Sequence, residues 1–202
     1  MDLFTTYIQK DKDESIADKV LEPCKKILSQ TKNTSKYKFG KTSYYDVSIW
    51  TEYRNDFNVL YDLIFKNAYA YCEKLQMKNI KTIDIDYIWV SELNKFGSHS
   101  LHAHPNSDLS GTFYVHVEPN SADIIFNRHE FMQHTLNDFN YEQYNQYNSN
   151  EWRFPAEKGG LIIWKSDLPH SVDLNMSESR IAISFNLKIY TNENVGVDNE
   201  RT

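Results

Sequence analysis

The sequence is poor in cysteine, glycine and proline. Its 202 residues include 2 cysteines, 6 glycines and 5 prolines, and the cysteines, Cys24 and Cys72, form no CxxC motif. So few cysteines argue against a disulfide framework and fit a reducing compartment. No Gly-, Ser- or Pro-rich linker marks a domain boundary, so we expect a single domain over residues 1–202.

Features of membrane and secreted proteins are also missing. No apolar run reaches transmembrane length, and the N-terminal MDLFTTYIQKDKDES lacks the apolar core of a signal peptide. We therefore expect a cytoplasmic protein with no membrane partner. If a phage encodes it, we expect it to act in the host cytoplasm. The net charge of -6 argues against nucleic acid as the main partner, because phosphate backbones attract basic surfaces. Oligomeric state is not readable.

Helical periodicity dominates before residue 80. Residues 14–30, ESIADKVLEPCKKILSQ, predict a short helix that is interrupted or ended near Pro23. A polar loop is expected over residues 31–46. Residues 55–76 predict a longer helix that Asn55 or Asp56 caps. Its apolar face comprises Phe57, Leu60, Tyr61, Ile64, Ala68, Tyr71 and Leu75.

Strand periodicity dominates after Lys78. KTIDIDYIWVSEL alternates Asp84 and Asp86 with Ile83, Ile85, Tyr87 and Trp89. LSGTFYVHVEP, ADIIFN, GGLIIWK and SRIAISFNLKIY are further strand candidates. Residues 137–154 are expected to form a long surface excursion whose tyrosines could line a groove. The order predicts an α+β, mainly β chain, in which a helical part (1–80) packs on a jelly-roll core (81–192).

Two histidines separated by one residue occur in SLHAHPNSDLSG. Residues i and i+2 of a strand project to the same side, and Pro105 favours an extended conformation for His104. His102 and His104 can therefore share a metal ion, since neutral imidazole binds iron, zinc, copper and nickel. His99 is out of phase with His102 and is not counted as a ligand. The alternative is a pair of exposed histidines beside a turn, because the motif alone is weak.

A third histidine, His170, follows a strand, a turn and a proline, and Arg180 then begins another strand. The Arg180 side of that strand is polar, whereas Ile181, Ile183 and Phe185 form an apolar side. A guanidinium on an inward polar side suits a carboxylate ligand, with which it forms two parallel hydrogen bonds. The alternative is a surface arginine on an edge strand. The residues sharing its side are Ala182, Ser184 and Asn186.

The strand after HAHPNSD is divided in the same way. Hydroxyl groups on a pocket-facing strand could bind an anionic ligand, and that of Tyr114 reaches furthest. The polar side could equally face water, as in many antiparallel sheets. The polar side comprises Ser110, Thr112, Tyr114 and His116, and the apolar side comprises Phe113, Val115 and Val117.

The segments HAHPNSDLSGTFYVHVEP and KGGLIIWKSDLPHSV…SRIAISFN resemble those of small 2-oxoglutarate- and Fe(II)-dependent oxygenases of bacteria and phages. That group shows an HxHP…SG..Y segment and a second segment with S.L.H, R and S.N in this order. DYIWVSELNKFGSHS is similar to its strand before the first histidine, and LFTTYI and GKTSYYD are looser likenesses. The resemblance covers most of the chain and is weak before residue 80.

The resemblance implies a double-stranded β-helix that binds Fe(II), 2-oxoglutarate as co-substrate and O2. The implied metal ligands are His102, His104 and His170. Most such oxygenases have Asp or Glu where this chain has His104. Asp108 is an alternative third ligand, ranked lower because the i, i+2 geometry favours His104.

The resemblance also implies a binding site for 2-oxoglutarate. Arg180 would bind its far carboxylate and would act with His102 and His170 as a catalytic residue. Further cofactor-binding candidates are Tyr114, Ser184 and Asn186. Arg128 and Trp164 could lie near the pocket, and each has an equally good explanation in packing.

The expected function is that of an Fe(II)/2-oxoglutarate-dependent hydroxylase, which releases succinate and CO2. Its prime substrate, whether protein, peptide or small molecule, is not readable. One alternative is a cupin-like metalloenzyme that does not use 2-oxoglutarate and has no need of Arg180. Another is a non-catalytic jelly-roll binding module, because this architecture has many functions.

Overall fold

The computed structural model describes residues 6–31, 39–128 and 141–192. The helical elements in these ranges are α1 (Glu14–Gln30), η1 (Ser43–Tyr45), α2 (Val47–Tyr53), η2 (Arg54–Phe57) and α3 (Asn58–Lys74). The strands are β1 (Gln9–Lys12), β2 (Gly40–Thr42), β3 (Ile80–Asn94), β4 (His99–His102), β5 (Leu109–His116), β6 (Ile124–Asn127), β7 (Glu151–Phe154), β8 (Gly160–Lys165), β9 (His170–Val172) and β10 (Ser179–Thr191).

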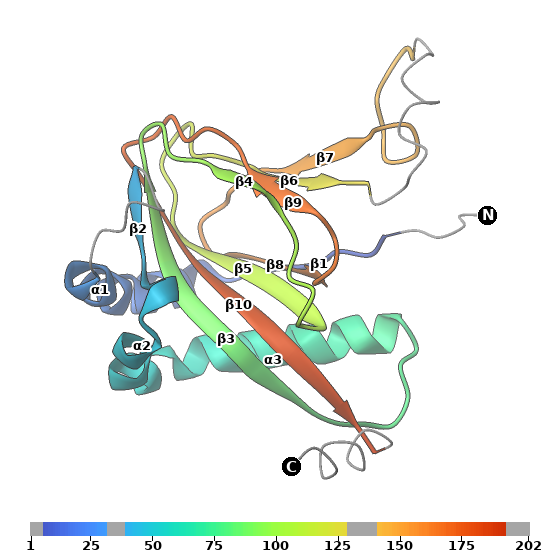
Figure 1. Cartoon of the computed structure of the whole chain (residues 1–202), viewed down its shortest axis with the longest axis horizontal. Helices are drawn as coiled ribbons and strands as arrows, with labels where there is room; N and C mark the ends of the chain where they lie inside the picture. The colour runs from blue at the N-terminus through green and yellow to red at the C-terminus, as the bar shows by residue number, and fades with distance from the viewer. Residues whose placement is uncertain (1–5, 32–38, 129–140, 193–202) are drawn as a thin grey trace.

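Two antiparallel sheets face each other. The major sheet has the strand order β1-β8-β5-β10-β3-β2, and the minor sheet has the order β4-β9-β6-β7. Figure 1 shows the helices against one side of the major sheet and the minor sheet on its other side. The arrangement is a double-stranded β-helix, so the predicted jelly roll with helices packed on it is confirmed.

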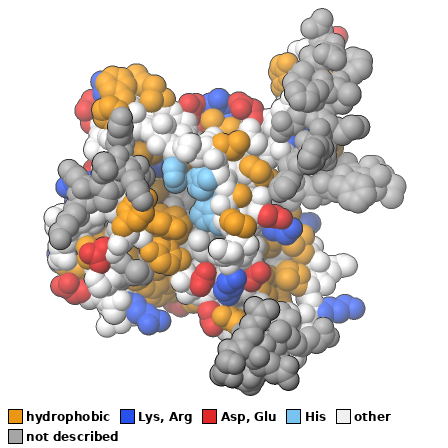
Figure 2. Space-filling view, viewed as in Figure 1, with side chains coloured by type: hydrophobic (Ala, Val, Ile, Leu, Met, Phe, Trp, Pro, Cys, Tyr) orange, Lys and Arg blue, Asp and Glu red, His pale blue; other side chains and the backbone are white. Residues whose placement is uncertain are grey.

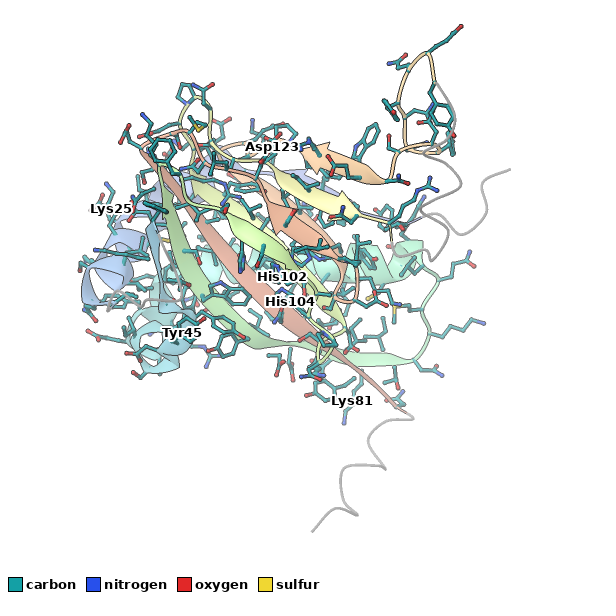
Figure 3. The ribbon with its side chains drawn as sticks, turned by 45° about the horizontal axis from the view of Figure 1, so that its top comes forward. Lys25, Tyr45, Lys81, His102, His104 and Asp123 are labelled. Carbon is teal, nitrogen blue, oxygen red and sulfur yellow. The ribbon has the colours of Figure 1, made fainter. Side chains whose placement is uncertain are left out.

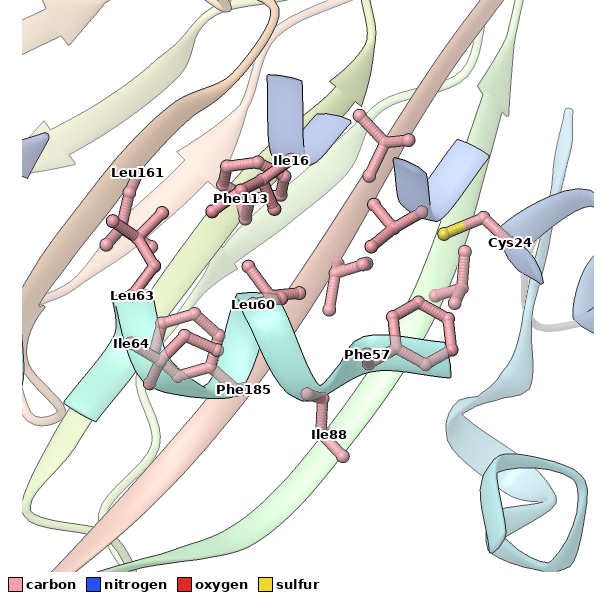
Figure 4. Packing of buried hydrophobic residues seen from close by; sticks show 14 of the residues in the cluster. Ile16, Cys24, Phe57, Leu60, Leu63, Ile64, Ile88, Phe113, Leu161 and Phe185 are labelled. Carbon is pink, nitrogen blue, oxygen red and sulfur yellow. The ribbon is translucent and has the colours of Figure 1, made fainter. Parts of the chain in front are cut away.

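Alternating side chains of the major sheet build two different layers. On β10, Ile181, Ile183 and Phe185 pack toward α1 and α3 in the larger core cluster, which Figure 4 shows in part. Residues of opposite phase on the same strand, including Arg180 and Ser184, face the space between the sheets. The predicted division of this strand into an apolar and a polar side is therefore confirmed.

β-Bulges change the phase of two strands. In β3, Tyr87 pairs with Asn186 and Ile85 with Leu187, so Asp86 is an extra residue without a partner on β10. As a result, Ile83 and Ile85 pack on the helices, whereas Tyr87 and Trp89 line the inner cavity. The expectation that these four residues share one face is wrong, because a bulge exchanges the faces of all residues beyond it.

The second bulge lies in β5. Ile181 pairs with His116 and Ala182 with Tyr114, which leaves Val115 as the extra residue. Val117 therefore packs in the inner cluster and not beside Val115. His116 hydrogen-bonds Glu118 and does not line the cavity, so it does not continue the polar side of Tyr114.

The N-terminal part contains more structure than expected. Helix α1 continues through Pro23 to Gln30. A proline inside a helix costs roughly 3 kcal/mol, and burial of Val20 and Ile27 on the same helix offsets this at roughly 1.5–3 kcal/mol each. Strands β1 and β2 add the two edges of the major sheet, so the part before residue 80 is not only helical. Residues 32–38 of the expected loop lie outside the described ranges.

The start and end of the longer helix also differ from the prediction. The turn η2 precedes α3, and neither Asn55 nor Asp56 caps it through a side chain. Leu75 follows the last helical residue and is exposed, whereas Leu60, Ile64 and the other predicted core residues are buried or half-buried.

The expected surface excursion is only partly described. Residues 137–140 lie outside the described ranges, and Glu151–Phe154 forms strand β7 beside β6. Arg128 donates hydrogen bonds to the carbonyls of Gln146 and Tyr147. No residue of 141–154 lines the inner cavity, so the described part does not form the predicted groove. Within the described residues, no helix has the length and apolarity needed to cross a bilayer.

Candidate active site

A cavity of about 500 Å³ opens between the two sheets. Its floor comes from β3, β5 and β10 of the major sheet, and its other wall comes from β4, β9 and the residues after β4. Figure 2 shows histidine side chains (pale blue) exposed in the middle of this face, beside hydrophobic side chains.

Three histidines converge in this cavity. His102 ends β4 and pairs with His170 at the start of β9, and His104 follows in the loop after β4. One ligand nitrogen from each of the three lies within 4.8 Å of the others. Figure 3 shows His102 and His104 next to each other over the major sheet. The group can hold one metal ion, although its members come from distant parts of the sequence.

Hydrogen bonds fix the tautomer of all three imidazoles. The Nδ1 atoms of His102 and His170 lie 2.8 Å from the Ser100 carbonyl and 2.9 Å from the Leu168 carbonyl. The Nδ1 atom of His104 lies 2.7 Å from the Asn186 Oδ1. These oxygens can only accept, so each Nδ1 donates its hydrogen and each Nε2 keeps a free lone pair. This is the arrangement that metal-binding histidines require.

The environment also keeps two of these imidazoles, those of His104 and His170, uncharged. Burial lowers the pKa of His170 to about 3. Burial also lowers the pKa of His104, against the opposing effect of its hydrogen bond to Asn186. Neutral rings at neutral pH can bind a cation without first losing a proton.

The geometry separates the alternative ligands. Asp108 accepts a hydrogen bond from the backbone N–H of Ile189 at 2.8 Å and does not line the cavity. His104 lies with the other two histidines, so the position favours it over Asp108. His99 lines the cavity, with its ring centroid 4.2 Å from that of His102. It is not one of the three converging histidines, which agrees with the sequence analysis, where His99 is not counted as a ligand.

Arg180 is a buried cation at the inner end of the cavity. Only 5% of the residue is exposed, and it forms no ion pair with any described residue. Its guanidinium lies 4.8 Å from the ring centroid of Tyr114. The Arg180 Nε, Tyr114 Oη and Trp164 Nε1 are buried without a hydrogen-bond partner among the described residues. Buried polar groups of this kind require a partner, so the group is suited to an anion.

The electrostatics of Tyr114 agree with this arrangement. Burial raises the pKa of Tyr114, and the charge of Arg180 opposes the shift. The hydroxyl therefore stays protonated and can donate. Tyr114 lies beneath Arg180 and outside the cavity lining, whereas Ser184 and Asn186 line the cavity.

A chain of hydrogen bonds connects the major sheet to His104. The Ser110 hydroxyl lies 2.8 Å from the hydroxyl of Ser166 and donates to the Asn186 Oδ1 at 2.8 Å. The Ser166 carbonyl accepts from the backbone N–H of His104 at 2.8 Å. Sequence reasoning missed this role of Ser166, although the S.L.H pattern contains it. From sequence, Trp164 could lie near the pocket or serve only in packing. In the structure it lines the cavity and contacts the His170 ring.

Comparisons with known proteins point to one family. Residues 87–186 match the family described as "Putative 2OG-Fe(II) oxygenase", and this range contains all three histidines and Arg180. No curated protein sequence matches the chain.

Solved structures show the same fold at low sequence identity. A prolyl-4-hydroxylase from Pseudomonas putida is 11% identical with a TM-score of 0.55, over 93% of this chain and 95% of that chain. A prolyl hydroxylase from Trichoplax adhaerens, in complex with a hypoxia inducible factor peptide, is 13% identical with a TM-score of 0.59, over 98% and 89%. HygX from Streptomyces hygroscopicus, with nickel and 2-oxoglutarate bound, is 8% identical with a TM-score of 0.54, over 91% and 83%. Taken together, the family match, the fold and the converging histidines show that residues 87–186 form a domain of the 2OG-Fe(II) oxygenase family.

Proposed function

We propose that this chain hydroxylates a peptide or small-molecule substrate, with Fe(II) bound by His102, His104 and His170 and 2-oxoglutarate bound at Arg180. The observation that carries the proposal is a buried arginine, without an ion pair among the described residues, beside three imidazoles whose ligand nitrogens converge. The family match and the metal and 2-oxoglutarate in the HygX structure support it.

The side chains of the cavity suit both Fe(II) and 2-oxoglutarate. Three Nε2 lone pairs suit a divalent transition metal, because neutral imidazole is a ligand for iron. Arg180 and Trp164 line the cavity and have donors without a partner among the described residues, and the Thr112 and Ser184 hydroxyls line the same cavity. When bound, Fe(II) and 2-oxoglutarate would activate O2, which is the oxidant: one oxygen atom would enter succinate as 2-oxoglutarate loses CO2, and the other would hydroxylate a C–H bond of the substrate.

The chain's own residues position these groups. Ser100, Leu168 and Asn186 hold the imidazoles with Nε2 directed to the metal position. The Arg180 guanidinium binds a dicarboxylate in a fixed direction, because it forms two parallel hydrogen bonds with one carboxylate. Arg180 is only 5% exposed, so little water reaches a carboxylate bound to it.

The two alternative functions explain less of the site. A three-histidine enzyme that does not use 2-oxoglutarate gives no reason for a buried Arg180 that has no counter-ion in the described part of the chain. A non-catalytic binding module gives no reason for three histidines whose Nδ1 atoms are all hydrogen-bonded to acceptors. Both features are expected of an oxygenase.

The test is succinate release from 2-oxoglutarate with Fe(II), measured without a prime substrate. We expect slow turnover by the native chain and none by the His102→Ala and His170→Ala variants. Arg180→Ala should raise the concentration of 2-oxoglutarate needed, because the anion loses its cation. His116→Ala is the matched control, since its ring lies outside the cavity. Full activity of His170→Ala would refute the proposal.

A further inference from the structure

One wall of the cavity consists of four aromatic side chains, here called the aromatic wall: Tyr44, Tyr45, Tyr87 and Trp89. The Tyr44 ring contacts the other three, with centroid distances of 5.2 Å to Tyr45, 5.0 Å to Tyr87 and 5.1 Å to Trp89. The Tyr87 hydroxyl also donates a hydrogen bond to the Tyr44 carbonyl. The short turn η1 is thereby attached to β3 as one surface.

The aromatic wall extends from the metal position to the mouth of the cavity. Trp89 is buried and stacks on His104, with a centroid distance of 6.1 Å and an angle of 23° between the rings. At the outer end, Tyr44 is 42% and Tyr45 is 54% exposed. Large aromatic rings left exposed at the rim of a cavity indicate a binding surface for an apolar group. Figure 3 shows Tyr45 on the side of the histidines where η1 and α2 lie.

A single carboxylate accompanies this wall. Apart from histidines, the charged residues among the described cavity lining are Arg180 at the inner end and Asp86. Asp86 is the extra residue of the β3 bulge, so Asp86 and Tyr87 both face the cavity although they are neighbours in sequence. Asp86 accepts one long hydrogen bond, of 3.4 Å, from Ser107 and forms no ion pair with a described residue.

We propose that the prime substrate carries an amine cation beside an apolar group, with the cation at Asp86 and the apolar part on the aromatic wall. This inference rests on the proposed function, which assigns Arg180 to the co-substrate and leaves Asp86 as the charge for the substrate. The Asp86 carboxylate selects the cation, and the aromatic wall binds the apolar part whether or not the ligand is charged. The amine belongs to a lysine side chain of a peptide or to a small cyclic amine.

Two matched pairs of probes test the proposal by isothermal titration calorimetry. The peptide pair is a capped pentapeptide with central lysine and the same peptide with norleucine. The small-molecule pair is cyclohexylmethylamine and cyclohexylmethanol. Titrations use the native chain with Zn²⁺ and 2-oxoglutarate, because zinc has no redox chemistry, and are repeated on the metal-free chain. We expect the cation of at least one pair to bind about three- to tenfold more tightly than its neutral partner.

Variants identify the groups responsible. Asp86→Asn should remove the preference for the cation, whereas Asp84→Asn, on the same strand but outside the cavity lining, should keep it. Tyr44→Ala should weaken the amine and the alcohol alike, and Tyr69→Ala, exposed on α3, should not. The pair with the larger preference identifies the source of the amine. Equal binding within both pairs, no binding of any probe, or an unchanged preference in Asp86→Asn would overturn the proposal.

The binding experiment and the succinate assay test the two proposals separately. Succinate release without a preference for amines would leave the proposed function standing and overturn the inference about the substrate. A preference that depends on Asp86, in a chain that releases no succinate, would support the amine site and refute the oxygenase proposal.

Discussion

The hydrogen-bond acceptor of each imidazole decides which ring nitrogen is available to a metal. For His102 and His170 the acceptor is a backbone carbonyl, which mutation cannot remove. For His104 it is the side chain of Asn186 on β10, which also accepts from Ser110. Asn186 was expected from sequence to bind the co-substrate. Its position gives it a second role, that of orienting His104.

The role of Asn186 can be tested by metal affinity. Asn186→Ala should weaken the binding of Ni²⁺ by about 10- to 100-fold, because His104 loses the partner that fixes its tautomer. Asn186→Asp keeps an acceptor and should retain most of the affinity. Asn106→Ala, also in the cavity lining, is the control. Calorimetric titration measures all four proteins, and native affinity in Asn186→Ala would contradict this role.

A second polar group holds β1 to α3. Asn67 is buried, accepts a hydrogen bond from Gln9 at 2.8 Å and donates to Asp11 at 2.9 Å. The bond from Asn67 lowers the pKa of the Asp11 carboxyl, with a smaller opposing effect from burial. A carboxyl whose pKa is lower in the folded chain adds stability above its unfolded pKa, and this stability is lost as pH falls through the folded value.

Asp11→Ala should therefore destabilise the chain in a pH-dependent way. At pH 7 the free energy of unfolding should fall by about 1–2 kcal/mol, since a hydrogen bond to a charged group is lost. The difference from the native chain should shrink as pH falls below about 4, where the unfolded carboxyl is protonated. Urea denaturation at several pH values measures this, with exposed Asp62→Ala as the control. A difference that stays constant down to pH 3 would contradict the assignment.

At the scale of elements, the sequence predicts best where alternation is unbroken. On β10, the apolar series from Ile181 and the polar series from Arg180 keep their phase across the whole cavity, so both faces are readable. Asp86 and Val115 each add one residue to a strand, and bulges leave no reliable mark in a pattern of period two. The predicted assignment of residues to the two faces of the strand is therefore wrong beyond each bulge.

The short elements could not be predicted for a different reason. Strand β2 has three residues and η1 has three, which is too few for any periodicity. Their positions depend on pairing with β3 and on the Tyr44–Tyr87 contact, which are distant in sequence. The three histidines were readable because the HxH spacing and the S.L.H pattern are local. The position of Trp164 beside His170 had no such local pattern, and the S.L.H pattern contains Ser166 but does not show its contact with His104.

One packing requirement of the sheet is encoded by a single glycine. Gly111 pairs with Phe185 on β10, and a Cβ atom at Gly111 would overlap the Phe185 ring and lie 2.9 Å from the Ile162 carbonyl. Gly111→Ala should lower the free energy of unfolding by about 1–3 kcal/mol, as expected for overpacking. Phe185→Leu in the same chain should recover part of the loss. Denaturant titration of the single and double variants measures the coupling, and strictly additive effects would contradict the clash.

At the scale of the whole molecule, the metal position joins the two sheets. His102 and His170 belong to the minor sheet, whereas His104 is bonded to Asn186 and Ser166 of the major sheet and its following turn. An ion bound by all three imidazoles therefore links both layers of the β-helix at their centre. A metal that binds only the folded chain stabilises it by mass action.

Metal should accordingly raise the melting temperature of the chain. At a free Ni²⁺ concentration about 100 times its Kd, the stabilisation is about 2.7 kcal/mol, and the melting temperature of a chain of this size should rise by about 5–10 °C. EDTA should reverse the shift. The shift should vanish in His170→Ala, because the two remaining imidazoles bind the ion too weakly to hold it at this concentration. In the presence of metal, 2-oxoglutarate should add a further shift in the native chain and little in Arg180→Ala. An equal metal shift in His170→Ala would mean that the ion binds elsewhere, and the three histidines would then not be its ligands.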